Sequence, residues 1–288
     1  MSKSPLIERY FACIGAQKAG TTWLARTLAR HDDIFITPVK EIHYFDHVAG
    51  LTGHLSDRKR RSRYRKYHQR MWTQWNRWKE HRAQGDWYRA YMRRELDDDW
   101  YASLFADRQG KTVAGEATPE YALIGKKGFR HMKALAPDAR VIYIMRNPVS
   151  RAWSQLLHQC RARRLNPARV PVEAFLSMAA EPRFEAIADY LQTLDDIDTE
   201  FGSSRALLAF YEDLHDDRAA ALRNVCDFLG VGLDDSLMHG LGARYNISPP
   251  VPLPNELSEA LRMKYGDIAE GVASRMGRIP ESWQADFK

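Results

Sequence analysis

The 288-residue chain has few cysteines and no long apolar run. Its three cysteines, Cys13, Cys160 and Cys226, are odd in number and lie far apart. This spacing argues against a disulfide framework or a cysteine metal site, and it favours buried thiols in a reducing compartment. The sequence contains neither the ~20 consecutive apolar residues of a membrane span nor the charged-then-apolar start of a signal peptide. We therefore expect a cytoplasmic protein without a transmembrane segment, for which peripheral contact with a membrane stays open.

The sequence also lacks a general excess of charge, because its basic residues are concentrated in one segment. The net charge is +6, yet residues 58–94 contain fourteen Lys and Arg against only two acids, Glu80 and Asp86. That segment carries +12, and the rest of the chain sums to −6. The basicity is a local feature and does not indicate a general affinity for polyanions.

Short apolar segments alternate with helical patterns along most of the chain. Strands are expected at Phe11–Gly15, Thr112–Gly115, Arg140–Met145 and Ala206–Tyr211. Helices are expected at Thr21–Arg30, Lys126–Leu135, Pro148–Cys160, Ile187–Phe201, Arg218–Leu229 and Glu256–Glu270. Continuous apolar strands are typical of parallel sheets covered on both faces. The pattern predicts one α/β domain over residues 1–288, a P-loop-like doubly wound parallel sheet flanked by helices, with ligands at the carboxyl ends of the strands.

Residues 48–100 interrupt this alternation and predict a helical insertion rich in basic and aromatic residues. Within it, residues 58–84 indicate one long polar helix, with aromatic and Met side chains from Tyr64 to Trp78 at three- and four-residue spacing. Two interpretations stay open. The helix packs its aromatic stripe on the domain and leaves its arginines in solvent, or it is a lid or docking element for an anionic or lipid-linked substrate.

Residues 14–24 are close to a nucleotide P-loop but depart from it at the lysine. A Walker A loop reads G-x-x-x-x-G-K-[ST], with the lysine directly after the second glycine. Here Gly15 and Gly20 keep the glycine spacing, but the lysine is Lys18, and Thr21 stands in the usual lysine position. A strand before the loop and a helix after it still predict an anion site formed by backbone N–H groups at the helix start.

A second candidate anion site follows the strand that ends at Met145. Arg146 comes next, and Ser154 lies eight residues after it. Pro148 suits the first turn of a helix, where its missing N–H is not needed, so Ser154 is placed two turns into that helix. An arginine guanidinium can donate two parallel hydrogen bonds to a terminal phosphate.

Together, these two segments resemble the nucleotide-binding motifs of sulfotransferases that use 3′-phosphoadenosine 5′-phosphosulfate (PAPS). The resemblance implies that Arg146 and Ser154 hold the 3′-phosphate. It implies that the first loop holds the 5′-phosphosulfate through Lys18, Ala19, Gly20, Thr21, Thr22 and Trp23. A sulfuryl group carries less charge than a γ-phosphoryl group, and the sequence has no obvious acidic metal site, so we expect no essential metal.

Residues 37–46 resemble the lysine-glutamate segment of carbohydrate-type sulfotransferases, including the heparan sulfate enzymes. The resemblance implies that Glu41 is the general base that takes the proton of an acceptor hydroxyl. His43 is an auxiliary or an alternative base, and Lys18 stabilises the charge that develops on the leaving phosphate.

Residues 115–121 look like the family's G-E-x-[ST]-P-x-Y loop, which lines the acceptor cleft. Glu116 is either structural or directed at the acceptor. Heparan O-sulfotransferases often have lysine where Ala117 stands, so this departure argues against a sulfated glycosaminoglycan acceptor. In relatives, a late loop gives a basic side chain to the 3′-phosphate, and Arg244 is the candidate here, although the usual R-K-G or K-G-R string is absent.

The expected activity is in-line transfer of a sulfuryl group from PAPS to an acceptor hydroxyl on a sugar, lipid or small metabolite. An ATP-dependent P-loop kinase is an alternative, against which Thr21 in the Walker lysine position argues. A nucleic-acid-binding protein that uses the basic helices of residues 58–94 is another. Such a protein would need neither the Lys18 loop nor the Arg146 and Ser154 pair, so no nucleic acid partner is expected.

Overall fold

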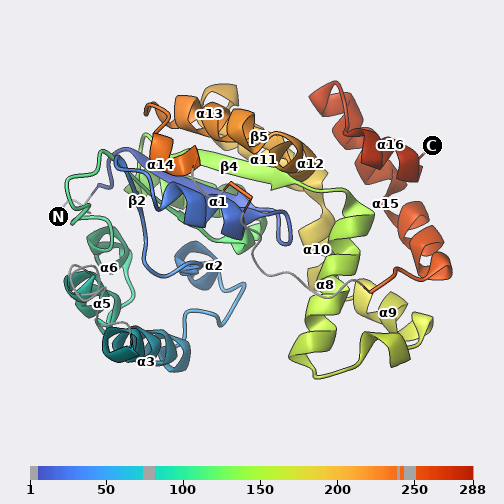
Figure 1. Ribbon diagram of the computed structural model, residues 1–288, viewed down its shortest axis with the longest axis horizontal. Coiled ribbons are helices and arrows are strands. Elements are labelled where there is room, and N and C mark those ends of the chain that lie inside the picture. The colour runs from blue at the N-terminus through green and yellow to red at the C-terminus, as the bar shows by residue number, and fades with distance from the viewer. Residues whose placement is uncertain (1–5, 74–81, 83, 239–240, 243–250, 288) are drawn as a thin grey trace.

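The computed structural model describes residues 6–73, 82, 84–238, 241–242 and 251–287. Within them, a five-stranded parallel sheet has the strand order β2-β3-β1-β4-β5 (Figure 1). The strands are β1 (Tyr10–Gly15), β2 (Ile34–Ile36), β3 (Val113–Ala117), β4 (Arg140–Met145) and β5 (Ala206–Phe210). This arrangement confirms the predicted α/β fold with a doubly wound parallel sheet.

The central strand β1 lies between β3 and β4. Its register pairs Tyr10 with Ala114 on β3, and Phe11 with Arg140 on β4. Every residue of β1 and β3 is buried, including Glu116 on β3, which explains why neither strand alternates apolar with exposed polar residues. The chain runs from β1 to β2 at one edge of the sheet, and from β4 to β5 at the other edge. The connections that leave the carboxyl ends of β1 and β4 therefore diverge and open a crevice there.

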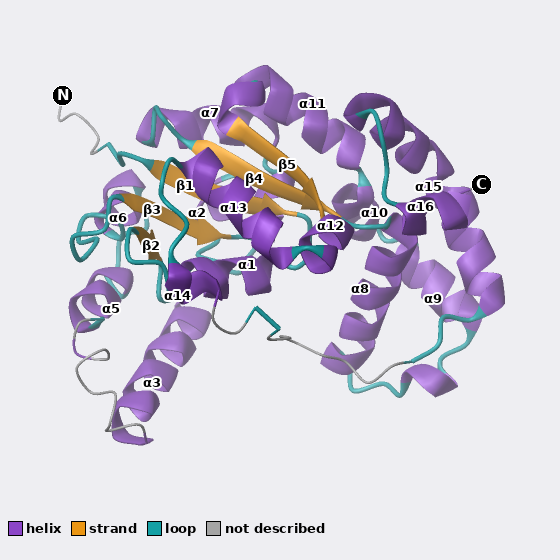
Figure 2. Cartoon of the chain, turned by 45° about the horizontal axis from the view of Figure 1, so that its top comes forward, coloured by secondary structure: helices purple, strands orange, loops and turns teal. Residues whose placement is uncertain are grey.

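Helices cover both faces of the sheet (Figure 2). α7 (Gly125–Leu135) and α11 (Tyr190–Glu200) pack together on one face, while α1 (Thr21–Leu28) and α13 (Arg218–Leu229) lie on the other. The α1 and α7 connections run in opposite directions across the sheet, so right-handed crossovers place them on opposite faces. Shorter elements are α2 (Tyr44–Val48), the 3-10 turns η2 (Pro119–Leu123), η3 (Pro167–Arg169) and η4 (Ser203–Arg205), α12 (Tyr211–Asp216), α14 (Asp235–Met238) and α16 (Glu281–Phe287).

A second buried cluster lies beside the sheet and is enclosed by helices. It is formed by α8 (Pro148–Ala162), α9 (Val172–Ala179), α10 (Pro182–Ala188) and α15 (Asn255–Met276). Because α15 also packs on α11, it joins this cluster to the main core. The contacts hold α8 at the edge of the crevice.

Within the described residues, the helical insertion contains α3 (Asp57–Thr73), α5 (Gly85–Tyr91) and α6 (Asp98–Ser103), on the side of the sheet where β2 lies (Figure 1). The rings of Tyr67 on α3 and Tyr88 on α5 stack with centroids 4.1 Å apart. Arg60 is 1% exposed and donates to the carbonyl oxygens of Tyr91 and Arg93. Part of the aromatic stripe thus packs inward, as the scaffold interpretation requires, and most of the other basic residues of α3 stay exposed.

The helix predicted over residues 58–84 is confirmed as far as Thr73 by α3, and most of its remaining length is not among the described residues. Residues 74–81 and 83 lie outside them, and Gln84 forms a turn before α5 begins. Trp75 and Trp78, which belong to the predicted stripe, are among these undescribed residues.

Two expectations are corrected. The helix predicted over residues 187–201 is two helices, because Asp189 ends α10 and caps α11 by accepting from the backbone N–H of Gln192 at 2.9 Å. The sheet also contains β2, whose three residues are too few for an alternation pattern to reveal. No helix among the described residues is long and apolar enough to cross a bilayer.

Candidate active site

A cavity of about 680 Å³ opens at the carboxyl ends of the central strands and extends to α8. Ala19 and His43, both predicted site residues, are buried and do not line it. The predicted residues that do line it are Lys18, Gly20, Thr21, Thr22, Trp23, Glu41, Arg146 and Ser154. Segments that are far apart in the sequence thus meet at one cavity.

The loop after β1 curls around one end of this cavity. Lys18 and Gly20 have left-handed backbones, with φ of 71° and 83°. The loop is fixed to the neighbouring strand because the Ala16 N–H donates to the Ile144 carbonyl at 2.7 Å. Among the described residues, no side chain caps α1, which begins at Thr21. The Trp23 N–H donates to the Gly20 carbonyl at 2.9 Å, so an anion at the helix start would meet the N–H groups of Thr21 and Thr22.

Gly20 brings the two predicted phosphate sites together. A Cβ atom on Gly20 would lie 3.1 Å from the Tyr211 ring, and its left-handed backbone also disfavours a side chain, so glycine suits this close approach. The Arg146 guanidinium lies over the Tyr211 ring, 4.5 Å from the ring centroid. Arg146 also donates to the Lys18 carbonyl at 2.9 Å. Lys18, Gly20, Tyr211 and Arg146 thus form one contiguous unit.

Positive charges are crowded on this side of the cavity. Burial lowers the pKa of Lys18, and the guanidinium groups of Arg146 and Arg161 lower it further. Burial likewise lowers the pKa of His158, together with the charges of Lys18 and Arg161. Positive side chains this close together repel one another, and an anion that binds among them offsets the repulsion and stabilises their charged forms. The electrostatics therefore indicate an anion site.

Helix α8 supplies one wall of the cavity. The helix begins as predicted at Pro148, and the Asn147 side chain caps it by accepting from the Ser150 N–H at 3.0 Å. Ser154, His158 and Arg161 are four and three residues apart, so they share one face of the helix, and all three line the cavity. The sequence reading missed His158 and Arg161, although helical spacing from Ser154 could have identified them.

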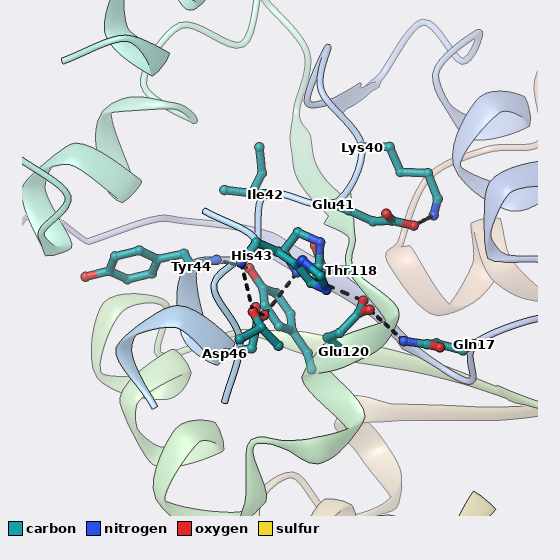
Figure 3. A network of polar contacts seen from close by, with 12 residues as sticks. Gln17, Lys40, Glu41, Ile42, His43, Tyr44, Asp46, Thr118 and Glu120 are labelled. Atoms are coloured by element: carbon teal, nitrogen blue, oxygen red, sulfur yellow. Dashed lines mark hydrogen bonds and ion pairs between the residues drawn. The ribbon is translucent and has the colours of Figure 1, made fainter. Parts of the chain in front are cut away.

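Glu41 lies on the opposite wall, in the segment that follows β2. Its carboxylate pairs with the Lys40 ammonium, toward which it points in Figure 3. Burial acts to raise the pKa of Glu41, but Lys40 and the nearby His43 and Arg63 outweigh burial and lower the pKa below its ordinary value. Glu41 is therefore held as a carboxylate, the form in which it can accept a proton.

His43 lies behind this wall, with 3% of its surface exposed. Its Nδ1 is 3.0 Å from Asp46 Oδ2, and its ring centroid is 4.7 Å from that of His54. Because the side chain does not line the cavity, the geometry favours Glu41 over His43 as the group that meets an acceptor.

Glu120 is a second carboxyl group in the cavity, which the sequence reading did not single out. It is 8% exposed and accepts a hydrogen bond from Gln17 Nε2 at 2.6 Å, while Nδ1 of His43 is 4.0 Å from Oε2 (Figure 3). Burial raises the pKa of Glu120; His43 opposes this effect and Glu41 adds to it. The two carboxyl groups of the cavity thus have pKa values displaced in opposite directions. Glu120 stands at the variable position before the tyrosine of the motif at residues 115–121, so the motif directs attention to the loop but not to this side chain.

Glu116 is structural, which settles the alternative that its motif left open. It is completely buried and accepts hydrogen bonds from the hydroxyls of Tyr101 at 2.5 Å, Thr118 at 2.6 Å and Tyr121 at 2.8 Å. It also accepts from the Ile42 N–H at 3.2 Å. Burial raises the pKa of Glu116. The side chain supports the Glu41 segment from below and does not face an acceptor.

A model of the sulfotransferase family matches residues 11–235, well over half of the chain. The chain belongs to the sulfotransferase family. It is an enzyme of the transferase class, as the sequence motifs predicted.

Among curated proteins, this sulfotransferase is similar to heparan sulfate glucosamine 3-O-sulfotransferase 6. It is 30% identical to the Homo sapiens protein over 141 residues, and 29% identical to the Mus musculus protein over 154 residues. The matches cover 46% and 50% of this chain and 39% of each relative. The similarity therefore extends over less than half of the relatives' length.

Among solved structures, this sulfotransferase is similar to a sulfotransferase from Alicyclobacillus acidocaldarius, with a TM-score of 0.65 and 23% identity over 95% of this chain and 98% of that chain. The sulfotransferase domain from the curacin biosynthetic pathway gives a TM-score of 0.54 and 16% identity over 96% and 99%. At these identities the likeness supports the fold alone.

Two predictions for this sulfotransferase concern features that the site does not display. Arg244, the predicted third ligand of the 3′-phosphate, lies outside the described residues. Within the described part of the chain, no group of three or more His, Cys, Asp and Glu side chains is arranged to hold a metal ion. Metal-free activity stays a prediction.

Proposed function

We propose that this sulfotransferase transfers a sulfuryl group from PAPS to an acceptor hydroxyl. The observation that carries the proposal is that Lys18, Glu41 and Arg146 line one cavity of about 680 Å³. A donor anchored at one end of that cavity and an acceptor at the other can then meet in the orientation that in-line transfer requires.

The donor end suits a molecule with two separate anionic groups. Lys18 and the uncapped start of α1 are suited to the 5′-phosphosulfate, and Arg146 with Ser154 to the 3′-phosphate. The crowding of Lys18, Arg146 and Arg161 is relieved by such a ligand. Arg244 is proposed as a further ligand of the 3′-phosphate.

The proposed chemistry needs one proton acceptor and one electrostatic stabiliser. The acceptor oxygen forms a bond to sulfur while the bond between sulfur and the bridging phosphate oxygen breaks. Glu41 takes the hydroxyl proton, and Lys18 stabilises the negative charge that grows on the leaving phosphate. His43, held by Asp46, assists from behind the Glu41 segment.

The proposed acceptor is an anionic or lipid-linked molecule that carries a hydroxyl group. The support is the basic face of α3, where Arg65, Lys66 and Arg70 are exposed. The curated relatives are named for the 3-O-sulfation of heparan sulfate glucosamine. Ala117 stands where heparan O-sulfotransferases often have lysine, so we do not carry that acceptor over.

Two measurements test the proposal. Calorimetry should give tight binding of adenosine 3′,5′-bisphosphate and weak binding of ATP, because only the former carries a 3′-phosphate for Arg146. Incubation with labelled PAPS and a host metabolite extract should transfer the label to a product identified by mass. Preference for ATP would favour a kinase instead, and a salt-sensitive DNA or RNA mobility shift without PAPS turnover would favour a nucleic-acid-binding protein.

A further inference from the structure

The backbone of residues 41–44 is held in an unusual conformation. Glu41 and His43 are not glycines, yet both have left-handed backbones, with φ of 63° and 64°. Side chains disfavour this region, so it persists only where surrounding contacts enforce it. The contacts that enforce it therefore fix the backbone from which the Glu41 side chain extends.

Three of these contacts come from β3 and the turn that follows it. The Glu41 N–H donates to the Ala117 carbonyl at 3.1 Å. The Ile42 N–H donates to the Glu116 carboxyl group, and the Tyr44 N–H donates to the Tyr121 hydroxyl at 3.0 Å. These contacts fix the N–H groups of the segment to the sheet.

The fourth contact comes from the helical insertion. Arg63 on α3 donates from Nη1 to the Glu41 carbonyl oxygen at 2.8 Å. The same nitrogen donates to the Tyr91 hydroxyl at 3.1 Å, and Tyr91 on α5 is fully buried. Both backbone polar groups of Glu41 are thus fixed, one by the sheet and one by the insertion.

We propose that Arg63 is a positioning residue for Glu41, which it holds from the insertion so that the carboxylate faces the cavity. This inference rests on the proposed role of Glu41 as the base. The helical insertion then has a part in catalysis that differs from acceptor docking: its inward face fixes the base, while its outward face presents exposed arginines and lysines.

Arg63 also acts on Glu41 through its charge. A nearby guanidinium favours the carboxylate, and Arg63 contributes to the lowered pKa of Glu41. Removing it should therefore raise that pKa. The charged and titratable groups that interact with Glu41 come from several elements and are Lys18, Lys40, His43, Arg63, Glu120 and His158.

The experiment compares Arg63→Gln with Arg61→Gln, a matched control on the same helix whose side chain is 71% exposed. PAPS is the only substrate, water is the acceptor, and release of adenosine 3′,5′-bisphosphate gives the rate. We expect Arg63→Gln to slow release on the order of tenfold to a hundredfold, since small displacements of a catalytic group have such effects. Calorimetric binding of the bisphosphate should stay unchanged in both variants.

Three readouts separate positioning from general structural support. The acid limb of the pH–rate profile should move to higher pH in Arg63→Gln. Arg63→Lys should restore part of the rate, because one donor and the charge return. Tyr91→Phe, which removes the second partner of Arg63, should lower the rate by a smaller factor.

A titration of carboxyl-labelled glutamate by NMR decides the matter without turnover. The Glu41 signal is identified by its loss in Glu41→Gln, and its pKa should rise in Arg63→Gln but not in Arg61→Gln. Equal behaviour of the two arginine variants overturns the proposal, as does a slower Arg63→Gln with an unshifted Glu41 titration. A wild-type protein that fails to bind the bisphosphate or turn over PAPS contradicts the proposed function instead, and the titration still tests Arg63.

Discussion

The two ends of the cavity are built in different ways. At the donor end, Lys18 and Arg146 lie in the loops that directly follow β1 and β4, so short local motifs carry their positions. At the acceptor end, Glu41 and Glu120 depend on contacts among β3, α3 and the loop that contains Gln17. The positions at the donor end can thus be predicted from local sequence, whereas those at the acceptor end depend on long-range contacts.

The largest effect should come from the donor end. We expect Lys18→Ala to lower kcat on the order of a hundredfold or more while the fold is retained, because the proposed role of Lys18 is to stabilise charge that develops during transfer. Steady-state rates at saturating PAPS, with circular dichroism as the control for folding, measure this. Turnover close to wild type would disprove the assignment of the loop to the phosphosulfate.

At the acceptor end, Glu41→Gln should abolish most turnover and leave donor binding intact, because the amide keeps the shape but cannot take a proton. Glu120→Gln is the matched control and should retain more activity. If Glu41→Gln stays active while His43→Ala is inactive, the base is His43.

The pH dependence should report the same carboxylate. Burial opposes ionisation of Glu41, but Lys40, His43 and Arg63 together outweigh burial and hold the pKa below the ordinary value, which is about 4.3 for glutamate. As the proposed base, Glu41 is ionised above that lowered pKa, and activity should be lost only as the pH falls through it. A pH–rate profile with an acid limb above pH 6 would assign the base to another group.

Variants of the 3′-phosphate ligands should have an intermediate effect that is confined to binding. Arg146 and Ser154 are proposed to contact a phosphate that does not react, so Arg146→Ala and Ser154→Ala should lower affinity with little change in kcat. Calorimetry with adenosine 3′,5′-bisphosphate measures this loss. Unchanged dissociation constants in both variants would remove the 3′-phosphate site from this end of the cavity.

The smallest effect should come from the outer face of the insertion. Charge reversal at Arg65, Lys66 and Arg70 should raise KM for an anionic acceptor and leave PAPS binding unchanged. KM should be measured at low salt, where screening of the charges on α3 is weakest. Unchanged kinetics there would assign this face of α3 to the scaffold alone.

The same contrast explains what the sequence could predict. The loop at Lys18 and the start of α8 at Pro148 follow buried strands, so apolar runs and capping signals locate them. Glu41 was found through resemblance, and nothing in its local pattern indicates a left-handed backbone.

The rest depends on tertiary contacts that leave no local trace. Glu120 reaches the cavity because its turn packs against the loop that holds Gln17, and Arg63 is one of many arginines on a polar helix until the fold directs it inward. The short strand β2 owes its structure to pairing with β3. Periodicity records which face of an element is buried, but not which distant residue meets it.

The ring of Tyr211 has a consequence for how a ligand would enter. It packs against both Gly20 and the Arg146 guanidinium, so one side chain supports the loop and the arginine together. A site that is already shaped loses little conformational entropy on association. The donor nucleotide should therefore bind by docking into a preorganised receptor, at a rate set by encounter rather than by folding of the loop.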